Sequence, residues 1–314
     1  MLRERIKANT NPNFGKKPEL RGWQELVQNG VIVVDKPAGP TSHQVSAYVQ
    51  KILKIDKAGH SGTLDPNVTG VLVIGLGEAT KVVHHLLRSG KEYVCVMHLH
   101  KPVPEYELRK VTSEHVGKIM QLPPVKSAVK RQLRERSIYD FTILEVKDQD
   151  VLFIVNVQAG TYIRKLCHDI GQKLGCGGHM MQLRRTRVAQ FREDKAVTLQ
   201  TLQDAFIAAQ QGNDSELKAI LLPVEAAISE MKQIVVLDSA INALTHGVQL
   251  KVPGIASYDD NIQLGDEIAI MSLKGELVCI AEARLGADKL AGSSGLAAKT
   301  TRVYMHPELY PRMQ

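Results

Sequence analysis

The stretch GHSGTLDPNVTGVLVIGLGEATK at residues 59–81 joins a glycine-punctuated loop to an apolar run. Gly59 and Gly62 give the backbone freedom, whereas Pro66 disfavours helical geometry at Asp65. The run VLVIGL that follows is short and apolar, which is typical of a buried strand. A loop between a helix and such a strand can hold one carboxylate toward a cleft. An isolated Asp-Pro pair more often only caps a turn, so the whole pattern, rather than Asp65 alone, indicates a site.

The segment before this loop predicts a strand and then a helix. VIVV at 31–34 is a short buried strand that ends at the turn-forming residues 37–40. Thr41 and Ser42 can cap a helix, and apolar residues then recur at the i, i+3, i+4 spacing of one buried face. The residues predicted on that face are Val45, Tyr48, Val49, Ile52 and Leu53.

After the loop, helical and strand patterns alternate up to about residue 231. Glycine and proline punctuate these patterns, and the apolar spacing changes between period two and period 3.6. Helices are predicted at 79–88, 112–121, 161–174, 198–210 and 214–231, and strands at 71–76, 93–99, 139–147, 151–158 and 185–191. The strands 139–147 and 151–158 are close enough in sequence to pair as a hairpin.

From Ile234 onward the chain changes character. Short strands alternate with Gly and Pro turns, and a single helix follows Asp238 and ends at Gly247. This pattern predicts a separate, mostly β module with its own core, because it is too small to share the core of the first unit. The predicted divisions are an N-terminal arm at 1–22, a main domain at 23–230 and a small domain at 231–314.

The composition predicts a folded protein with a polyanionic partner. Of the 314 residues, 44% are hydrophobic and 23% charged, which argues against disorder. Lys and Arg total 40 against 33 Asp and Glu, giving a formal net charge of +7. Such a balance favours nucleic acid, although a soluble protein can also simply be basic.

The four cysteines are far apart in sequence and have neither CxxC nor zinc-finger spacing. They are therefore expected as reduced core thiols of a cytoplasmic protein. No apolar run reaches the length of a membrane span, and the N-terminus lacks the apolar core of a signal peptide. The histidines form no HExxH motif or ligand triad, so neither a metal nor another cofactor is expected.

Four segments, in order, resemble the TruB family of pseudouridine synthases. The first is DKPAGPTSHQV at 35–45, and the second is the loop-and-strand stretch at 59–81. The others are KEYVCVM at 91–97 and GTYIRKLCHDIG at 160–171, the latter followed by LRRTRVAQF. The resemblance covers roughly residues 23–230. It implies an α/β (α+β) catalytic domain built on a mixed, mainly antiparallel sheet.

Within the family, the chain is similar to the archaeal branch, which is related to eukaryotic dyskerin. PPVKSAVKRQLRERSIYDF at 123–141 resembles that branch's loop over the active site, and the C-terminal module resembles a PUA RNA-binding β-barrel. This resemblance implies an RNA substrate (rRNA or tRNA), an H/ACA guide RNA and several protein partners. The expected partners are small Nop- and Gar-type core proteins and a kink-turn-binding protein.

The resemblance makes Asp65 the catalytic carboxylate for isomerisation of a flipped-out uridine. Two routes stay open: attack on C1′, or abstraction of the 2′ proton to give a glycal. Both need an ionised carboxylate, whereas a closed pocket raises a carboxyl pKa. Arg164 matches the family arginine, whose guanidinium would oppose that shift. Without the resemblance, Arg164 would be an ordinary arginine on a helix face.

Three further residues match supporting positions of the family. Tyr93 matches the active-site tyrosine, which can stack on uracil and whose hydroxyl is a candidate in C5 deprotonation. His60 matches the loop histidine that contacts the substrate or its neighbour, and Lys36 is expected to support the catalytic loop. By pattern alone, Tyr93 would be a core residue and His60 a turn residue.

Basic side chains outside the motif core are candidate RNA contacts, with a solvated basic face as the alternative for each. In the C-terminal module, the loop at 246–255 would be the RNA-facing edge. The candidates are Lys126, Lys130, Arg131, Arg134, Arg184, Arg185, Arg187, His246 and Lys251.

Two questions remain open at the level of sequence. The first is whether the protein is an active synthase or a catalytically inactive RNA-binding scaffold of a ribonucleoprotein; the intact motif set favours the enzyme. The second is whether it acts on rRNA through a guide RNA or alone on uridine 55 of tRNA. The resemblance to the guide-dependent branch favours the first target.

Overall fold

The computed structural model describes residues 1–123, 130–292 and 294–312. The chain forms two compact units, and each unit is built from segments that are not contiguous in the sequence. The first unit comprises residues 1–31, 76–79 and 221–314, and the second comprises 32–75 and 80–220. Among helices of the described residues, none combines the length and the apolar character needed to cross a membrane.

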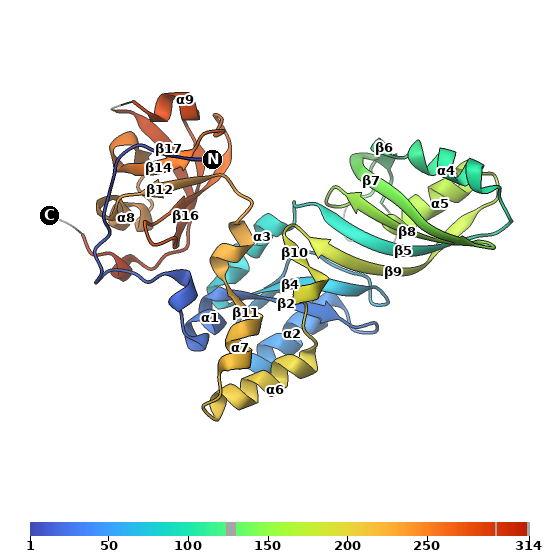
Figure 1. The fold of residues 1–314 in the computed structure, drawn as a ribbon, viewed down its shortest axis with the longest axis horizontal. Coiled ribbons are helices and arrows are strands. Elements are labelled where there is room, and N and C mark those ends of the chain that lie inside the picture. The colour runs from blue at the N-terminus through green and yellow to red at the C-terminus, as the bar shows by residue number, and fades with distance from the viewer. Residues whose placement is uncertain (124–129, 293, 313–314) are drawn as a thin grey trace. The chain divides into compact units, whose positions relative to one another are not determined.

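The second unit contains a large mixed sheet (Figure 1). Its strand order is β2-β4-β9-β5-β8-β7-β6, in which β4 and β9 run parallel while β9, β5, β8, β7 and β6 pair antiparallel. The strands are β2 Gly30–Lys36, β3 Ala58–His60, β4 Thr69–Leu76, β5 Lys91–Leu99, β6 Gly117–Gln121, β7 Arg134–Lys147, β8 Asp150–Val157, β9 Gly178–Val188 and β10 Phe191–Arg192. The prediction of a mixed, mainly antiparallel sheet is confirmed.

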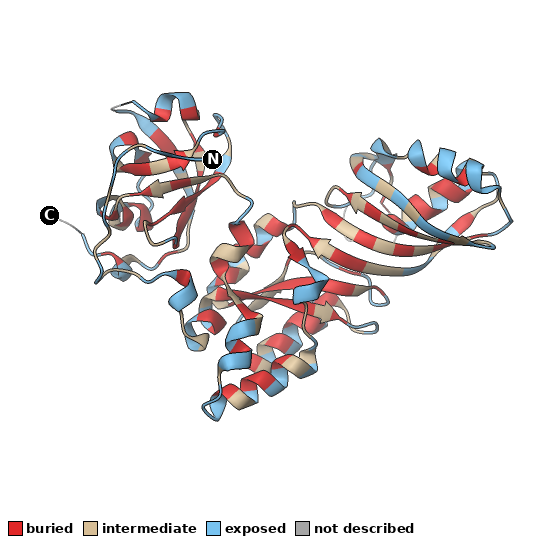
Figure 2. Ribbon diagram, viewed as in Figure 1, coloured by how far each residue is buried: buried red, intermediate tan, exposed pale blue. Residues whose placement is uncertain are grey.

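Six helices accompany this sheet in the described part of the unit: α2 Ser42–Leu53, α3 Val83–Leu86, α4 Glu105–Ser113, α5 Ile163–Lys173, α6 Leu199–Gln210 and α7 Ser215–Ile220. Strand β5 shows why the layers form, because its residues alternate strictly between buried and half-buried (Figure 2). Buried residues of β5 and of α5 belong to one apolar cluster, so α5 covers that face of the sheet.

The first unit is built on a curled seven-stranded sheet with the order β1-β14-β12-β15-β16-β17-β13. Its strands are β1 Leu2–Glu4, β12 Gln233–Val236, β13 Leu250–Lys251, β14 Ile255–Asp259, β15 Glu267–Met271, β16 Leu277–Ala283 and β17 Leu296–Val303. Helices α1 Trp23–Asn29, α8 Asp238–Thr245 and α9 Ala287–Leu290 and the short strand β11 Leu221–Pro223 complete the unit. The predicted small β module with its own core is therefore present.

The N-terminal arm belongs to this unit because its first strand pairs with β14. The side chain of Asp238 accepts hydrogen bonds from the Thr10 hydroxyl (2.9 Å) and from the Asn11 amide (2.8 Å). The buried carboxylate of Glu276 accepts bonds from the Lys16 amide (2.9 Å) and the Tyr310 hydroxyl (2.6 Å). Two carboxylates thus fasten the arm to the C-terminal residues.

Several predicted elements need correction. Residues 112–121 are not one helix: α4 begins directly after Pro104, and the chain then turns at Gly117, where φ is +100°, into strand β6. The helix predicted at 79–88 is a 3-10 turn over Gly77–Lys81 followed by the single turn α3. The helix predicted at 214–231 stops at Ile220, because the next residues enter β11 and Pro223. Tyr48 lies on the exposed face of α2, not on the buried one.

Candidate active site

The loop between β3 and β4 carries Asp65 at its exposed tip. The Asp65 carbonyl accepts a bond from the Val68 amide (3.0 Å), which closes a tight turn. On the other side of the turn, the Leu64 amide donates to the Ser42 hydroxyl of α2 (2.8 Å). The side chain of Asp65 is 52% exposed, whereas Leu64 and Val68 are buried in the core beneath it. The backbone is therefore anchored while the carboxylate faces outward.

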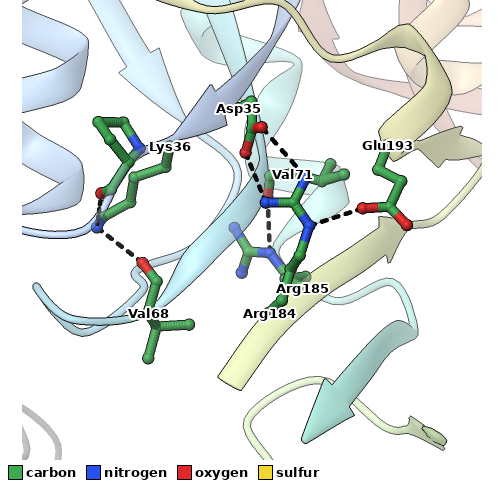
Figure 3. Close-up of polar contacts among 8 residues, drawn as sticks. Asp35, Lys36, Val68, Val71, Arg184, Arg185 and Glu193 are labelled. Atoms are coloured by element: carbon green, nitrogen blue, oxygen red, sulfur yellow. Dashed lines mark hydrogen bonds and ion pairs between the residues drawn. The ribbon is translucent and has the colours of Figure 1, made fainter. Parts of the chain in front are cut away.

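Lys36, at the end of β2, supports this loop from inside. Its side chain is fully buried, and its Nζ donates to the carbonyl oxygens of Pro37 (2.9 Å) and Pro66 (2.9 Å). It also donates to the carbonyl oxygen of Val68 (2.8 Å; Figure 3). Burial lowers the pKa of Lys36, and the nearby Arg185 lowers it further. Two of the three carbonyls belong to the turn that follows Asp65, so Lys36 sets the backbone at this position.

Arg164 forms an ion pair with Asp65. The arginine lies in the first turn of α5, and its side chain is 48% exposed. An ion pair as exposed as this one contributes at most about 1 kcal/mol to stability. Its effect is therefore mainly on orientation: the guanidinium holds the carboxylate in one direction and supplies a positive charge beside it.

Tyr93 lies on β5 and is 91% buried, being 9% exposed. It belongs to the same apolar cluster as Leu64 and Val68 of the loop and Ile163, the neighbour of Arg164. The structure therefore brings the segments of the three residues Asp65, Arg164 and Tyr93 together on the α5 face of the sheet.

His60 lies just before the loop, in β3. Its ring packs edge-on against that of His43, with the centroids 4.8 Å apart, and its Nδ1 accepts a bond from the Gly62 amide (3.3 Å). Burial, with smaller contributions from His43 and Arg185, lowers the pKa of His60 to about 4, so the ring is neutral near pH 7. Within the described part of the chain, its buried Nε2 has no hydrogen-bond partner.

The arginines of β9 do not have equal access to solvent. Arg184 is partly exposed and forms ion pairs with Asp35 (2.9 Å) and Glu193 (2.7 Å), as Figure 3 shows. Arg185 is 1% exposed, and its guanidinium bonds inside the protein. The expectation of a phosphate contact is therefore wrong for Arg185, because its neighbours in the sheet enclose it. Arg187 is partly exposed and donates to Asn156 (2.6 Å).

The other predicted RNA contacts lie on the surface where the structure describes them. Lys130 and Arg131 are exposed, and Arg134 at the start of β7 is half-buried. His246 and Lys251 are exposed in the C-terminal module. Lys126 lies outside the described residues.

Sequence reasoning missed two residues that shape the site. Ser42 was considered only as a helix cap, but the cap is Thr41, and the Ser42 hydroxyl instead bonds to the loop at Leu64. Lys91 is buried and donates to three carbonyl oxygens, those of Leu86, Leu87 and Ser89. Burial lowers the pKa of Lys91 to about 7. A lysine at the start of a buried strand was the available signal.

The described residues contain no group of three or more His, Cys, Asp or Glu side chains arranged to hold a metal ion. The four cysteines are free thiols, and the Sγ atoms of Cys95 and Cys167 lie 3.7 Å apart in the core. The site therefore offers a carboxylate, a guanidinium, a tyrosine and a neutral imidazole, which suit acid–base or nucleophilic chemistry at a bound ligand.

Four family models match consecutive parts of the chain. Residues 50–163 match the N-terminal domain of TruB family pseudouridylate synthases, and residues 164–229 match the C-terminal domain of tRNA pseudouridylate synthase B. Residues 232–304 match the PUA domain, and residues 2–46 match the DKCLD (NUC011) domain.

Similar proteins extend over nearly the whole chain. "Probable tRNA pseudouridine synthase B" of Methanosarcina barkeri is 50% identical over 307 residues, which cover 97% of this chain and 91% of that protein. The protein of the same description from Methanothermobacter thermautotrophicus is 50% identical over 98% of this chain and 95% of its own length.

Two solved structures are similar in fold and sequence. One is described as an H/ACA RNP bound to a substrate RNA containing 2′-deoxyuridine. Its matching chain has a TM-score of 0.94 and 43% identity, over 99% of this chain and 96% of that one. The other is described as a Cbf5-Nop10-Gar1 complex, with a TM-score of 0.94 and 45% identity over 100% of this chain and 96% of that one.

Proposed function

The chain belongs to the TruB family of pseudouridine synthases, and from that premise we propose that it isomerises uridine in RNA with Asp65 as the catalytic carboxylate. The observation that carries the proposal is the ion pair between Asp65 and Arg164 at the exposed tip of an anchored loop. The backbone of that loop is held by the buried ammonium group of Lys36. A rigid backbone with an outward carboxylate suits attack on a nucleotide that has left its helix.

The reaction breaks the C1′–N1 bond, turns the uracil and joins C5 to C1′. The ionised Asp65 acts at the ribose, either by attack on C1′ or by removal of the 2′ proton. Arg164 keeps the carboxylate charged and directed in both routes. Extrusion of the uridine from its stack costs a few kcal/mol, and contacts between the protein and the RNA offset this cost.

Tyr93 and His60 complete the proposed site. The Tyr93 ring is placed among the apolar residues beneath the loop, where it can stack on uracil, and its hydroxyl is a candidate in C5 deprotonation. The neutral ring of His60 has a buried Nε2 without a partner in the described residues, which supports a hydrogen bond to the RNA.

We propose that the target is chosen by an H/ACA guide RNA, with Nop10- and Gar1-type proteins as partners. The likeness over the whole chain to the subunit of an H/ACA RNP and of a Cbf5-Nop10-Gar1 complex supports this assignment. A kink-turn-binding protein is a further proposed partner. The name tRNA pseudouridine synthase B of the relatives favours uridine 55 of tRNA as a second candidate target.

The remaining assignments follow from the same premise. We propose an arm at 1–22, a catalytic domain at 23–230 and an RNA-binding domain at 231–314; the family matches that end at residue 229 and begin at residue 232 support the second boundary. The free thiols support a cytoplasmic location. The proposed RNA contacts are Lys126, Lys130, Arg131, Arg134, Arg184, Arg187, His246 and Lys251.

Replacement of the carboxylate tests the proposed chemistry. Asp65→Asn keeps the shape of the side chain but removes its charge, so we expect tritium release from C5-labelled uridine to fall by at least about 10⁴-fold while RNA binding persists. Asp56→Asn, which changes an exposed carboxylate shortly before the loop, is the matched control and should retain full activity. Full activity of Asp65→Asn would exclude the assignment.

The choice of target needs a separate experiment. Pseudouridine is quantified in tRNA and in guide-paired RNA, each with and without the partner proteins. Guide-directed action predicts product in the guide-paired RNA that depends on the guide. Product in tRNA alone would assign the protein to the stand-alone reaction, and no product in either RNA would favour an inactive scaffold.

A further inference from the structure

Arg185 lies where three segments of the proposed active site meet. Its Nε donates to the carbonyl oxygen of Val71 on β4 (2.8 Å; Figure 3), and its Nη2 donates to that of Gly62 in the catalytic loop (3.2 Å). Tyr93 on β5 lies directly opposite Arg185 in the β5–β9 ladder, so the two side chains are neighbours on the same face of the sheet. One buried side chain therefore binds the strand and the loop and lies beside the tyrosine.

The sheet register fixes this arrangement. Arg185 pairs with Gly70 across the parallel β4–β9 ladder and with Tyr93 across the antiparallel β5–β9 ladder. A Cβ atom at Gly70 would lie 2.1 Å from the carbonyl oxygen of Arg185, so only glycine permits this approach of the two strands. The guanidinium is thus placed by the backbone of its own strand and not only by side-chain packing.

A fully buried guanidinium is a costly way to fill space. It stays charged, and it donates here to two carbonyl oxygens rather than to a carboxylate. An apolar residue of similar volume would pack the same strands with a smaller desolvation penalty. An apolar residue could not, however, donate to the Gly62 carbonyl or offer a donor beside Tyr93.

The chemistry of the donor also orients the tyrosine. Arginine only donates hydrogen bonds, so the Tyr93 oxygen can meet the guanidinium only as an acceptor. In that arrangement the hydrogen of the hydroxyl is directed away from Arg185. The same guanidinium donates to Gly62, which relates the position of Tyr93 to the loop of Asp65.

We propose that Arg185 is a positioning residue for the isomerisation, which holds the Tyr93 hydroxyl in a fixed place relative to the loop of Asp65. The proposal rests on the proposed function, in which Asp65 and Tyr93 act on the flipped uridine. Arg185 acts through Tyr93 and does not bind the RNA backbone.

A double-mutant cycle of Arg185→Lys and Tyr93→Phe tests this role. Lysine keeps the charge but cannot reach all three partners, so we expect the single-turnover rate of tritium release to fall about 10- to 100-fold while the RNA dissociation constant changes less than about threefold. In the Tyr93→Phe background, which lacks the hydroxyl, Arg185→Lys should lower the rate by less than about threefold. Arg192→Lys, at the exposed residue of β10, is the matched control and should keep the wild-type rate.

The outcomes distinguish a failure of the positioning role of Arg185 from a failure of the proposed function. If Arg185→Lys lowers the rate by the same factor in both backgrounds, or lowers RNA affinity instead, the positioning role is overturned while Asp65 keeps its own. If the wild-type protein makes no pseudouridine, the proposed function fails and this inference fails with it. Circular dichroism and urea unfolding establish that each variant is folded, and Arg185→Gln replaces Arg185→Lys in the cycle if the latter is not.

Discussion

The loop of Asp65 is held by cationic side chains, whereas the N-terminal arm is held by carboxylates. The loop is fastened by buried cations: Lys36 donates to three carbonyl oxygens, and Arg185 donates to the Gly62 carbonyl. The arm is fastened by the carboxylates of Asp238 and Glu276, which accept from backbone amides and hydroxyls of the arm and the C-terminal residues.

The difference follows from which backbone groups face inward. A turn that directs carbonyl oxygens into the protein needs donors, and a segment that directs amides inward needs acceptors. The choice also has an electrostatic consequence. Cations beneath the loop favour the ionised form of a nearby carboxylate and attract phosphates, whereas carboxylates beneath the arm would oppose both. A loop held by buried cations therefore suits a site that acts on RNA, whereas a segment held by carboxylates does not.

The largest effect is expected when the cation of the loop is removed. Lys36→Met fills the same space but leaves three carbonyl oxygens without their donor, so we expect a loss of about 2–4 kcal/mol in the free energy of unfolding and at least about 100-fold in the rate of pseudouridine formation. Urea unfolding and single-turnover assays measure the two quantities, with the exposed Lys51→Met as the control. Wild-type activity in Lys36→Met would show that the reaction does not depend on the buried cation beneath the loop.

A smaller effect is expected on the arm. Glu276→Gln keeps the shape and part of the hydrogen bonding, so we expect a loss of about 1–2 kcal/mol in unfolding free energy and an unchanged rate per folded molecule. The same two assays apply, and Glu308→Gln, at a side chain that is 89% exposed, is the control. A rate loss as large as that of Lys36→Met would mean that the carboxylate, too, serves the chemistry.

The smallest effect concerns pH. The pKa of His60 is about 4 in the folded protein and near its ordinary 6.5 when unfolded, so between these values the unfolded state binds more protons. Stability from this group is present above pH 6.5 and is lost as the pH falls toward 4. Because the ring is partly open to solvent, we expect less than about 1 kcal/mol. Urea unfolding at pH 7 and 4.5 should show a weaker acid loss in His60→Gln, and an unchanged one in the exposed control His168→Gln.

The sequence predicted the elements whose pattern is local. The turn at Asp65, the buried strand after it and the hairpin of β7 and β8 follow from glycine, proline and apolar spacing. The helix predicted at 112–121 is wrong because the helix begins directly after Pro104 and ends at Ser113. A proline just before a helical pattern is itself a signal for a helix start.

Arg185 shows what the sequence concealed. LRRTRV reads as a run of exposed cations, but neighbouring residues of a strand face opposite sides of the sheet. Arg184 and Arg185 therefore could not both have faced solvent once α5 covered one side. The alternation of a strand therefore predicts that one of the two arginines is buried. It does not predict the neighbours of the buried guanidinium, because they come from segments about 90 to 120 positions away.

The pairing of the arm has a consequence for synthesis on the ribosome. Residues 2–4 form a strand with β14, and the Lys16 amide binds an acceptor that lies 260 positions further along the chain. At about 5–20 residues per second, that acceptor is made about 13–50 s after Lys16. The arm is thus synthesised well before the residues that bind it, and a chain cut short before the C-terminal module would lack those partners.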